Sequence, residues 1–305
     1  MTLDATAAAD SQAWLSRAEA CLRLRRWHEA RELAEARLTQ EPQDGEAHRV
    51  RAQALWGLGR RGAAREAVRE ALRQDPQEGR FLWVLGSMEC DEARGRAARA
   101  VARQLVALCP DWAPAWRLAA RAALLPGGDP RAGERHAREA LRREPNSPDG
   151  MWLLGLSLLL QGRPRQAEAH FRQGLARDAS HVGCLVGMVR CHLRARRLAQ
   201  ARDTARQAIA LNPTSRRVEQ VYALTVGSLH PVFRPLAWWS FSVGQWSLGR
   251  RVAGLALVLL LLGQAAAVLP PAGQVLLSLA YTGAVLYLLA GGALFRLAVA
   301  RRWFL

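Results

Sequence analysis

The sequence contains no lysine, so its 43 strongly basic side chains are all arginines. It also has a single isoleucine and two asparagines, whereas alanine, leucine and arginine are abundant, which indicates a compositionally biased genome. Part of the net charge of +17 then reflects coding bias, so charge alone does not establish binding to a polyanion. Half of the 305 residues are apolar, which excludes a chain that is disordered throughout.

The five cysteines are odd in number and spread over the whole length, which does not suit a disulfide framework. One group of possible metal ligands occurs, formed by His181, Cys184, Cys191 and His192. It lacks the closely spaced cysteine pairs that are typical of zinc sites, so buried thiols in a packed helix explain it better. Gly127-Gly128 lacks the lysine of a phosphate-binding loop. We therefore expect no enzymatic activity, no metal and no cofactor.

Charge is distributed unevenly along the chain. Residues 163–251 carry 15 arginines and 4 acids, whereas residues 1–162 are nearly balanced, with 25 arginines and 22 acids. An RNA-binding role for residues 163–217 would need aromatic side chains for base stacking, and Phe171 is the only aromatic residue there. We therefore expect no nucleic-acid partner. The first ten residues have no long apolar stretch, so we expect a short tail over residues 1–10 and no signal peptide.

An internal repeat fills the first two thirds of the chain. Proline recurs with spacings of 34, 34, 35 and 68 residues, at Pro42, Pro76, Pro110, Pro145 and Pro213, with Ala179 at the missing midpoint. Twelve residues before each of these six positions stands a small residue: Ala30, Ala64, Ala98, Gly133, Ala167 and Ala201. A second column lies twelve residues further back and is again mostly small, with Ala18, Ala52, Gly86, a site near Ala120, Gly155 and Val189. The two columns predict two helices that cross closely in each unit, with proline after the second helix.

With these residues the chain resembles the tetratricopeptide repeat family. The fifth unit matches best, with Trp152, Leu154-Gly155, Leu158, Ala167 and Phe171 in the family's positions. The resemblance implies an all-α, right-handed solenoid of six helix pairs over residues 11–213 and a capping helix over residues 214–229. Arg17 and Arg51 replace the preferred leucine, and Pro126-Gly127-Gly128 is an insertion, so the boundaries of units one and four stay open.

The resemblance also implies that the first helix of each pair lines a concave groove that binds a protein partner. The residues at its groove positions are Arg49, Gln53, Trp56, Arg80, Trp83, Ser87, Arg117, Arg121, Trp152, Leu156, Leu159, Arg190 and Leu193. Arginine and tryptophan are enriched where binding energy concentrates, so a peptide or helix with acidic and apolar side chains is the expected partner. In the alternative interpretation the tryptophans only pack between repeats and the arginines are solvated. A clamp for chaperone tails is excluded, because it needs lysine.

The C-terminal region predicts a membrane hairpin. Residues 252–269 and 275–295 contain no charge and are each about long enough to span a bilayer, with a Pro270-Pro271 turn between them. Arginines lie on both flanks, at Arg250, Arg251, Arg296, Arg301 and Arg302, and the turn has none. The positive-inside rule then places both ends and the repeats in the cytoplasm, at the inner membrane of a bacterium.

Residues 230–250 form a separate aromatic and basic segment. Its aromatic residues Trp238, Trp239, Phe241 and Trp246, together with the flanking arginines, predict a helix at headgroup level on an anionic membrane. Alternatively, the same aromatics dock the capping helix onto the hairpin. The sequence as a whole therefore predicts a membrane-anchored scaffold that holds a protein partner at the membrane. The alternative function is an integral subunit or assembly factor of a larger membrane complex, in which the hairpin contacts other membrane proteins.

Overall fold

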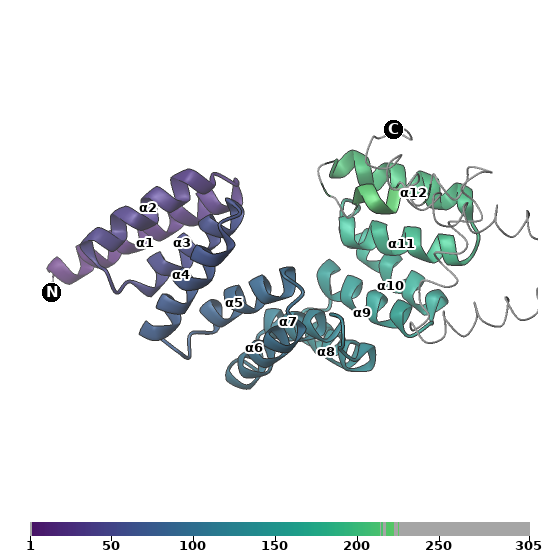
Figure 1. The fold of residues 1–305 in the computed structure, drawn as a ribbon, viewed down its shortest axis with the longest axis horizontal. Helices are drawn as coiled ribbons and strands as arrows, with labels where there is room; N and C mark the ends of the chain where they lie inside the picture. Colours follow the sequence, from purple (N-terminus) through teal and green to yellow (C-terminus); the bar gives the residue numbers. More distant parts are fainter. Residues whose placement is uncertain (1, 214, 216–217, 223–224, 226–305) are drawn as a thin grey trace, which may run out of the picture. The chain divides into compact units, whose positions relative to one another are not determined.

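The computed structural model describes residues 2–213, 215, 218–222 and 225, and side chains from residue 12 onward. The chain divides after Arg177 into two units, which are described separately. The first unit contains ten helices (Figure 1): α1 (Thr2–Arg23), α2 (Trp27–Gln40), α3 (Gly45–Gly57), α4 (Arg61–Gln74), α5 (Gly79–Asp91), α6 (Gly95–Leu108), α7 (Ala113–Ala123), α8 (Pro130–Arg143), α9 (Pro148–Leu160) and α10 (Pro164–Arg177). In the second unit α11 (Val182–Arg194) and α12 (Leu198–Leu211) are described. Six helix pairs confirm the predicted all-α repeat architecture.

The turn inside most pairs has three residues, and its middle residue adopts a positive φ. In the first, third and sixth pairs this residue is not glycine: Arg25, Ala93 and Arg196 have φ values of 58°, 55° and 57°. In the second and fifth pairs Gly59 and Gly162 have a φ of 79° and avoid the strain that a side chain brings there. The left-handed residue reverses the chain and lets the second helix begin.

The two columns of small residues are buried, as the sequence predicts. Ala18, Ala52 and Ala120 have no exposed surface, and neither do Ala30, Ala64 and Ala98 in the other column. At Gly155 an added Cβ would lie 2.6 Å from the ring of Phe171, which is itself fully buried. The absence of a side chain at Gly155 therefore lets α9 and α10 approach each other with Phe171 between them.

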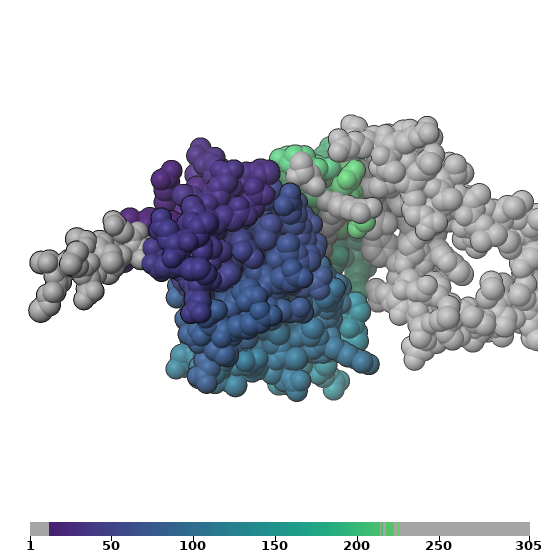
Figure 2. Space-filling model, turned by 60° about the vertical axis from the view of Figure 1, so that its left-hand side comes forward, coloured from purple at the N-terminus to yellow at the C-terminus, as the bar shows by residue number. Residues whose placement is uncertain are grey.

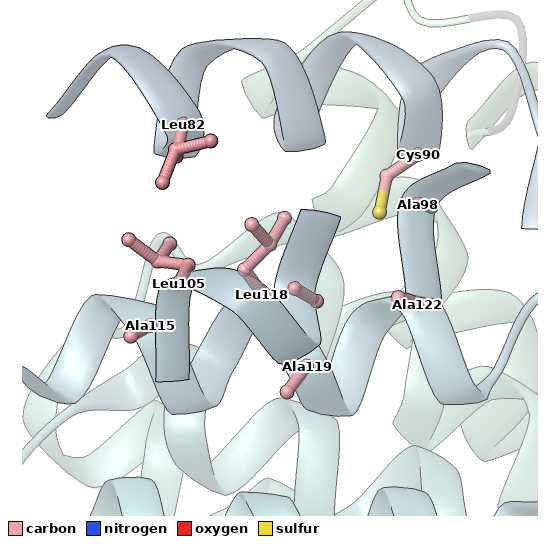
Figure 3. Close-up of a cluster of buried hydrophobic side chains, with 9 residues drawn as sticks. Leu82, Cys90, Ala98, Leu105, Ala115, Leu118, Ala119 and Ala122 are labelled. Atoms are coloured by element: carbon pink, nitrogen blue, oxygen red, sulfur yellow. The ribbon is translucent and has the colours of Figure 1, made fainter. Parts of the chain in front are cut away.

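The core of the middle repeats shows how neighbouring pairs share apolar contacts. In Figure 3, Leu82 of α5 points toward Leu105 of α6 and Leu118 of α7, and the thiol of Cys90 points toward Ala98. Figure 2 shows the helices of residues 12–177, coloured from purple to teal, as a contiguous packed body. The clusters of the first, second and third pairs each include residues of the following pair, so these neighbouring pairs share their cores.

The fourth pair differs from the regular pattern in its turn, and the first pair differs in where its first helix begins. The turn between α7 and α8 is longer, at residues 124–129, and contains Gly127 with a φ of 73°. Asp129 ends this turn and caps α8 by accepting hydrogen bonds from the amides of Arg131 and Ala132, at 2.9 and 3.0 Å. Helix α1 begins at Thr2 rather than near residue 11, because the alanine-rich start favours helix.

The predicted C-terminal elements lie largely outside the described residues. Residues 218–222 and 225, within the expected capping helix, are helical, and Val218, Val221, Tyr222 and Thr225 are buried. The segments predicted to be juxtamembrane (230–250) and membrane-spanning (252–269 and 275–295) are not described. Within the described part of the chain, none of the helices combines the length and apolarity that crossing a membrane requires.

Candidate partner-binding surface

The first helices of successive pairs contact one another in the first unit, where α1, α3, α5, α7 and α9 follow as a row. We call this set the first-helix row. On α5 Arg80, Trp83, Ser87 and Asp91 stay at least partly exposed, recur every three or four residues and share one face, whereas Leu85, also partly exposed, packs against a core cluster. The predicted partner-binding residues of this helix therefore do lie together on one stripe.

Arg49 on α3 is bound within the protein. Only 6% of the residue is exposed, and its guanidinium group donates to Glu46 at 2.5 Å, Gln53 at 2.8 Å and Glu19 at 2.9 Å. Glu19 belongs to α1, so Arg49 links two successive first helices. Little of Arg49 is left for a partner to touch, and Gln53 is held by the same group.

The other predicted arginines of the row are also paired, although they are more exposed. Arg80 of α5 pairs with Glu46 of α3 at 2.9 Å and with Glu78 at 3.2 Å. Arg121 of α7 pairs with Asp91 of α5. Arg117 pairs with Glu144 and donates to Ser147 at 3.2 Å, just before α9. Each of these arginines joins a first helix to a neighbouring repeat.

The carboxylates of these pairs were missed by sequence reasoning. Glu19 precedes Arg49 by 30 residues, Glu46 precedes Arg80 by 34, and Asp91 precedes Arg121 by 30. An acid about one repeat length before an arginine is therefore the signal that would have revealed them. The charged part of the row is largely neutralised from within the chain, which reduces what it offers to an acidic partner.

The pairing also shifts the pKa values at the start of α5. Burial by itself would raise the pKa of Glu78, but hydrogen bonds from the amide and side chain of Arg80 outweigh it and lower the pKa. Burial would lower the pKa of Arg80, whereas its bond to Glu78 and the charge of Glu46 raise it. Both groups therefore stay ionised at neutral pH.

The tryptophans of the row differ in exposure. Trp56 at the end of α3 is half-buried beneath Arg61, whose guanidinium carbon lies 3.8 Å from the ring centroid. Trp83 is 36% exposed, which makes it one of the exposed large apolar side chains of the described residues. The others, Leu24, Leu108, Leu160 and Leu211, lie at or just beyond helix ends, whereas Trp83 lies in the middle of α5.

Helix α9 presents an apolar stripe instead of a charged one. Trp152 and Leu156 are half-buried and share a face with Leu160, which is exposed. Leu159, which the sequence places in the groove, is buried in the core, and Leu160 takes the outer position. The row therefore changes character along its length, from ion-paired at α3, α5 and α7 to apolar at α9.

The remaining predicted contact residues lie elsewhere. Arg190 and Leu193 belong to α11 in the second unit and are half-buried. The membrane-interface residues lie outside the described part: Trp238, Trp239, Phe241, Trp246, Arg250, Arg251, Arg301 and Arg302. Among the described residues, no three His, Cys, Asp or Glu side chains are grouped to hold a metal ion. His181 caps α11 instead, where its Nδ1 accepts from the amide of Cys184 at 3.1 Å.

Comparisons with known proteins agree with this architecture. Residues 11–54, 49–111, 123–182 and 158–224 match models of the tetratricopeptide repeat, and together they include more than half of the chain. Comparison with curated proteins gives no match.

Several solved structures share the fold. A thermophilic repeat protein of Thermus thermophilus has 21% identity and a TM-score of 0.54, and the match covers 60% of this chain and 98% of that one. PilW, a widely conserved type IV pilus biogenesis factor, has 20% identity and a TM-score of 0.58, with 69% and 97% covered. The structure of pilF of Pseudomonas aeruginosa has 17% identity and a TM-score of 0.55, and the match covers 70% of this chain and 96% of that one. At these identities the likeness concerns the fold alone.

Proposed function

Since the chain belongs to the tetratricopeptide repeat family, we propose that it is a scaffold that binds a protein partner on its first-helix row and holds it at a membrane. A repeat array of this kind has no enclosed core in any one pair, and it exposes an extended surface suited to peptides. The observation that carries the proposal is Trp83, a large apolar side chain exposed in mid-helix with charged groups on the same stripe.

The partner is a peptide or helix whose apolar side chains contact Trp83, Trp152 and Leu156. Large aromatic residues contribute strongly to binding when a partner removes water from them. Acidic side chains of the partner have a smaller part than the sequence alone indicates, because Arg49, Arg80 and the α7 arginines already have carboxylate partners. The exposed edge of Arg80, whose side chain is 53% exposed, still offers a donor beside Trp83.

Membrane anchoring rests on the sequence of the C-terminal region. Two uncharged segments of 18 and 21 residues, flanked by arginines, support an inner-membrane hairpin with the repeats on the cytoplasmic side. The aromatic residues of 230–250 and the neighbouring arginines support contact with anionic lipid. Labelling of single cysteines introduced at Gly273 and Gln12 in intact cells tests this topology, with position 273 labelled from outside and position 12 labelled only after lysis.

Partner binding is tested by photocrosslinking in the membrane-embedded full chain. A photoreactive residue at Ser87, one helical turn from Trp83 on the same stripe, leaves the tryptophan in place. We expect one dominant protein adduct, and we expect Trp83→Ala to abolish it. A photoreactive residue at Arg69, on the outer surface of α4, is the matched control for random collisions.

The outcomes separate the two functions. The scaffold function is supported if the Ser87 probe crosslinks a cytoplasmic or membrane-associated protein and this adduct disappears in Trp83→Ala. Adducts that are equal at Ser87 and Arg69, or unaffected by Trp83→Ala, contradict binding on the first-helix row. If membrane proteins then copurify through the hairpin alone, the chain is a subunit of a larger membrane complex.

A further inference from the structure

A recess lies between the second helices of the third and fourth pairs. Its volume is about 640 Å³, and its walls come from α6 and α8 with a floor from α7. Arg96, Arg99 and Arg103 line one wall and recur at spacings of three and four residues, so they share one face of α6. Ala119 and Ala123 form part of the floor. We call this recess the α6–α8 groove.

The groove is open because its floor residues are small. Ala102, Ala119 and Ala123 stand 34 residues after Val68, Leu85 and Glu89, which occupy the same repeat positions one unit earlier. Val68 and Glu89 are buried and Leu85 is partly buried, so larger side chains fill the corresponding space there. These three replacements by alanine, one on α6 and two on α7, leave room for a ligand's side chains.

Arg99 lacks an internal partner that the equivalent arginine one period earlier has. In that repeat Arg65 pairs with Glu92 at 3.5 Å. Arg99 stands one period after Arg65, but the residue one period after Glu92 is Pro126 of the inserted turn. The Nη1 atom of Arg99 is buried and has no hydrogen-bond partner within the described part of the chain. A buried guanidinium N–H group needs a hydrogen-bond acceptor, and the carboxylate that Glu92 provides one period earlier is replaced by Pro126 here.

The acids near the groove do not neutralise it. Helix α6 contains no acid at all. Asp129 lines the opposite wall and keeps its negative charge while it caps the start of α8, so the three arginines outnumber the one acid of the groove lining. Glu139 of α8 pairs with Arg142 and Arg143. His136, also in the wall, does not add charge at neutral pH, because burial and the neighbouring Arg135 lower its pKa.

The groove and the first-helix row lie on different sides of α7. Ala119 follows Arg117 by two residues, and Ala123 follows Arg121 by two, which corresponds to about 200° around a helix in both cases. A ligand in the groove therefore does not compete with one on the row. The distance along α6 from Arg96 to Arg103 is about 10 Å, which matches carboxylates about three residues apart in an extended peptide.

We propose that the α6–α8 groove binds an acidic segment of a protein partner, with carboxylates on Arg96, Arg99 and Arg103 and an apolar side chain on the alanine floor. The recessed apolar floor favours such a segment over a flat membrane surface, because a headgroup layer would contact only the arginine rim. The site is separate from the first-helix row, so variants at Trp83 leave it intact.

Photocrosslinking followed by affinity measurement tests this proposal on the full chain. A photoreactive residue replaces Val106, which lines the groove and is half-buried. The control position is Leu72, one period earlier on α4. We expect a dominant adduct from Val106 alone, mapped by mass spectrometry to a segment with two or more Asp or Glu residues. That segment is then synthesised, and its binding to the detergent-solubilised chain is measured by fluorescence anisotropy.

The arginine variants decide whether charge carries the binding. The double variant R99Q/R103Q should weaken binding of the synthetic segment at least about tenfold, and salt should weaken binding to the unsubstituted chain. R69Q, at the equivalent of Arg103 one repeat earlier, should have no effect. Circular dichroism checks that each variant is folded. The proposal would be overturned if Val106 gave no adduct, a lipid adduct or an adduct with a segment that lacks carboxylates. It would also be overturned if Leu72 gave an equal adduct, or if R99Q/R103Q bound the segment with unchanged affinity.

Discussion

Two regions of the first-helix row are held in place by different interactions, ion pairs in one and apolar packing in the other. At α3 and α5, successive first helices are joined by ion pairs, with Arg49 bound to Glu19 and Arg80 bound to Glu46. At α9 the stripe is apolar, and the helix is held by Phe171 of α10 packed against Gly155. A charged residue at a predicted contact position can therefore belong to the scaffold itself, while an apolar residue on the same row stays available to a partner.

The largest expected effect comes from breaking the apolar region. Phe171→Ala removes a fully buried ring between α9 and α10 and should lower the free energy of unfolding by about 3–5 kcal/mol. Because packing and not charge is lost, the difference from the unsubstituted chain should be the same at low and high salt. Urea unfolding of the full chain in detergent, followed by circular dichroism, measures it. A loss below about 1 kcal/mol would contradict the packing described for this pair.

The next largest effect comes from the charged region. Arg49→Met leaves the carboxylates of Glu19 and Glu46 without their shared partner, and should destabilise the chain by about 2 kcal/mol, since Glu19 can still reach water. Hydrogen exchange should rise in α1 and α3 but not in α9. Exchange rising equally in all helices would show that the ion pairs do not act locally.

Much of this architecture was predictable from the sequence, and the reason is physical. Close helix crossings exclude large side chains, so the buried columns that include Ala64 and Ala98 recur with the period of the repeat. Glu19 and Glu46, which pair with Arg49 and Arg80 from neighbouring first helices, were not predicted, because a spacing of about one repeat allows such a contact but does not fix how the two helices are rotated against each other. The position of Leu159 was also missed, since one residue of helical rotation decides between core and surface.

A smaller effect tests a buried polar connection in the apolar region. Glu134 of α8 accepts from Gln161 at 2.7 Å and pairs with Arg138 and Arg163, so it connects α8 to the turn after α9. Burial would raise its pKa, but the bond from Gln161 and the arginine charges outweigh this and lower it below 4.5. Glu134→Gln should cost about 1–2 kcal/mol at neutral pH.

The pH dependence of that cost follows from the direction of the shift. A carboxyl group whose pKa is lower in the folded state stabilises the fold above its unfolded pKa, and loses this effect as pH falls through the folded pKa. The difference between Glu134→Gln and the unsubstituted chain should therefore be constant above pH 4.5 and shrink below it. Unfolding midpoints across this range measure it, and a difference that grows in acid would contradict the assignment.

The smallest effect is expected at the exposed end of the charged region. Arg80→Gln removes pairs whose arginine is 53% exposed, so the free energy of unfolding should change by less than about 1 kcal/mol. The same urea unfolding experiment measures it. A loss as large as that of Arg49→Met would mean that the two arginines are equally important to the row, despite their different burial.

The central claim is that the tryptophans bind the partner while the paired arginines hold the repeats together. Its most direct test is quantitative copurification of the crosslinked partner with two variants of the full chain, W83A/W152A and R80Q/R121Q. We predict that the tryptophan variant loses the partner although it stays folded, and that the arginine variant retains most of it. Retention by the tryptophan variant, together with loss by the arginine variant, would contradict the account.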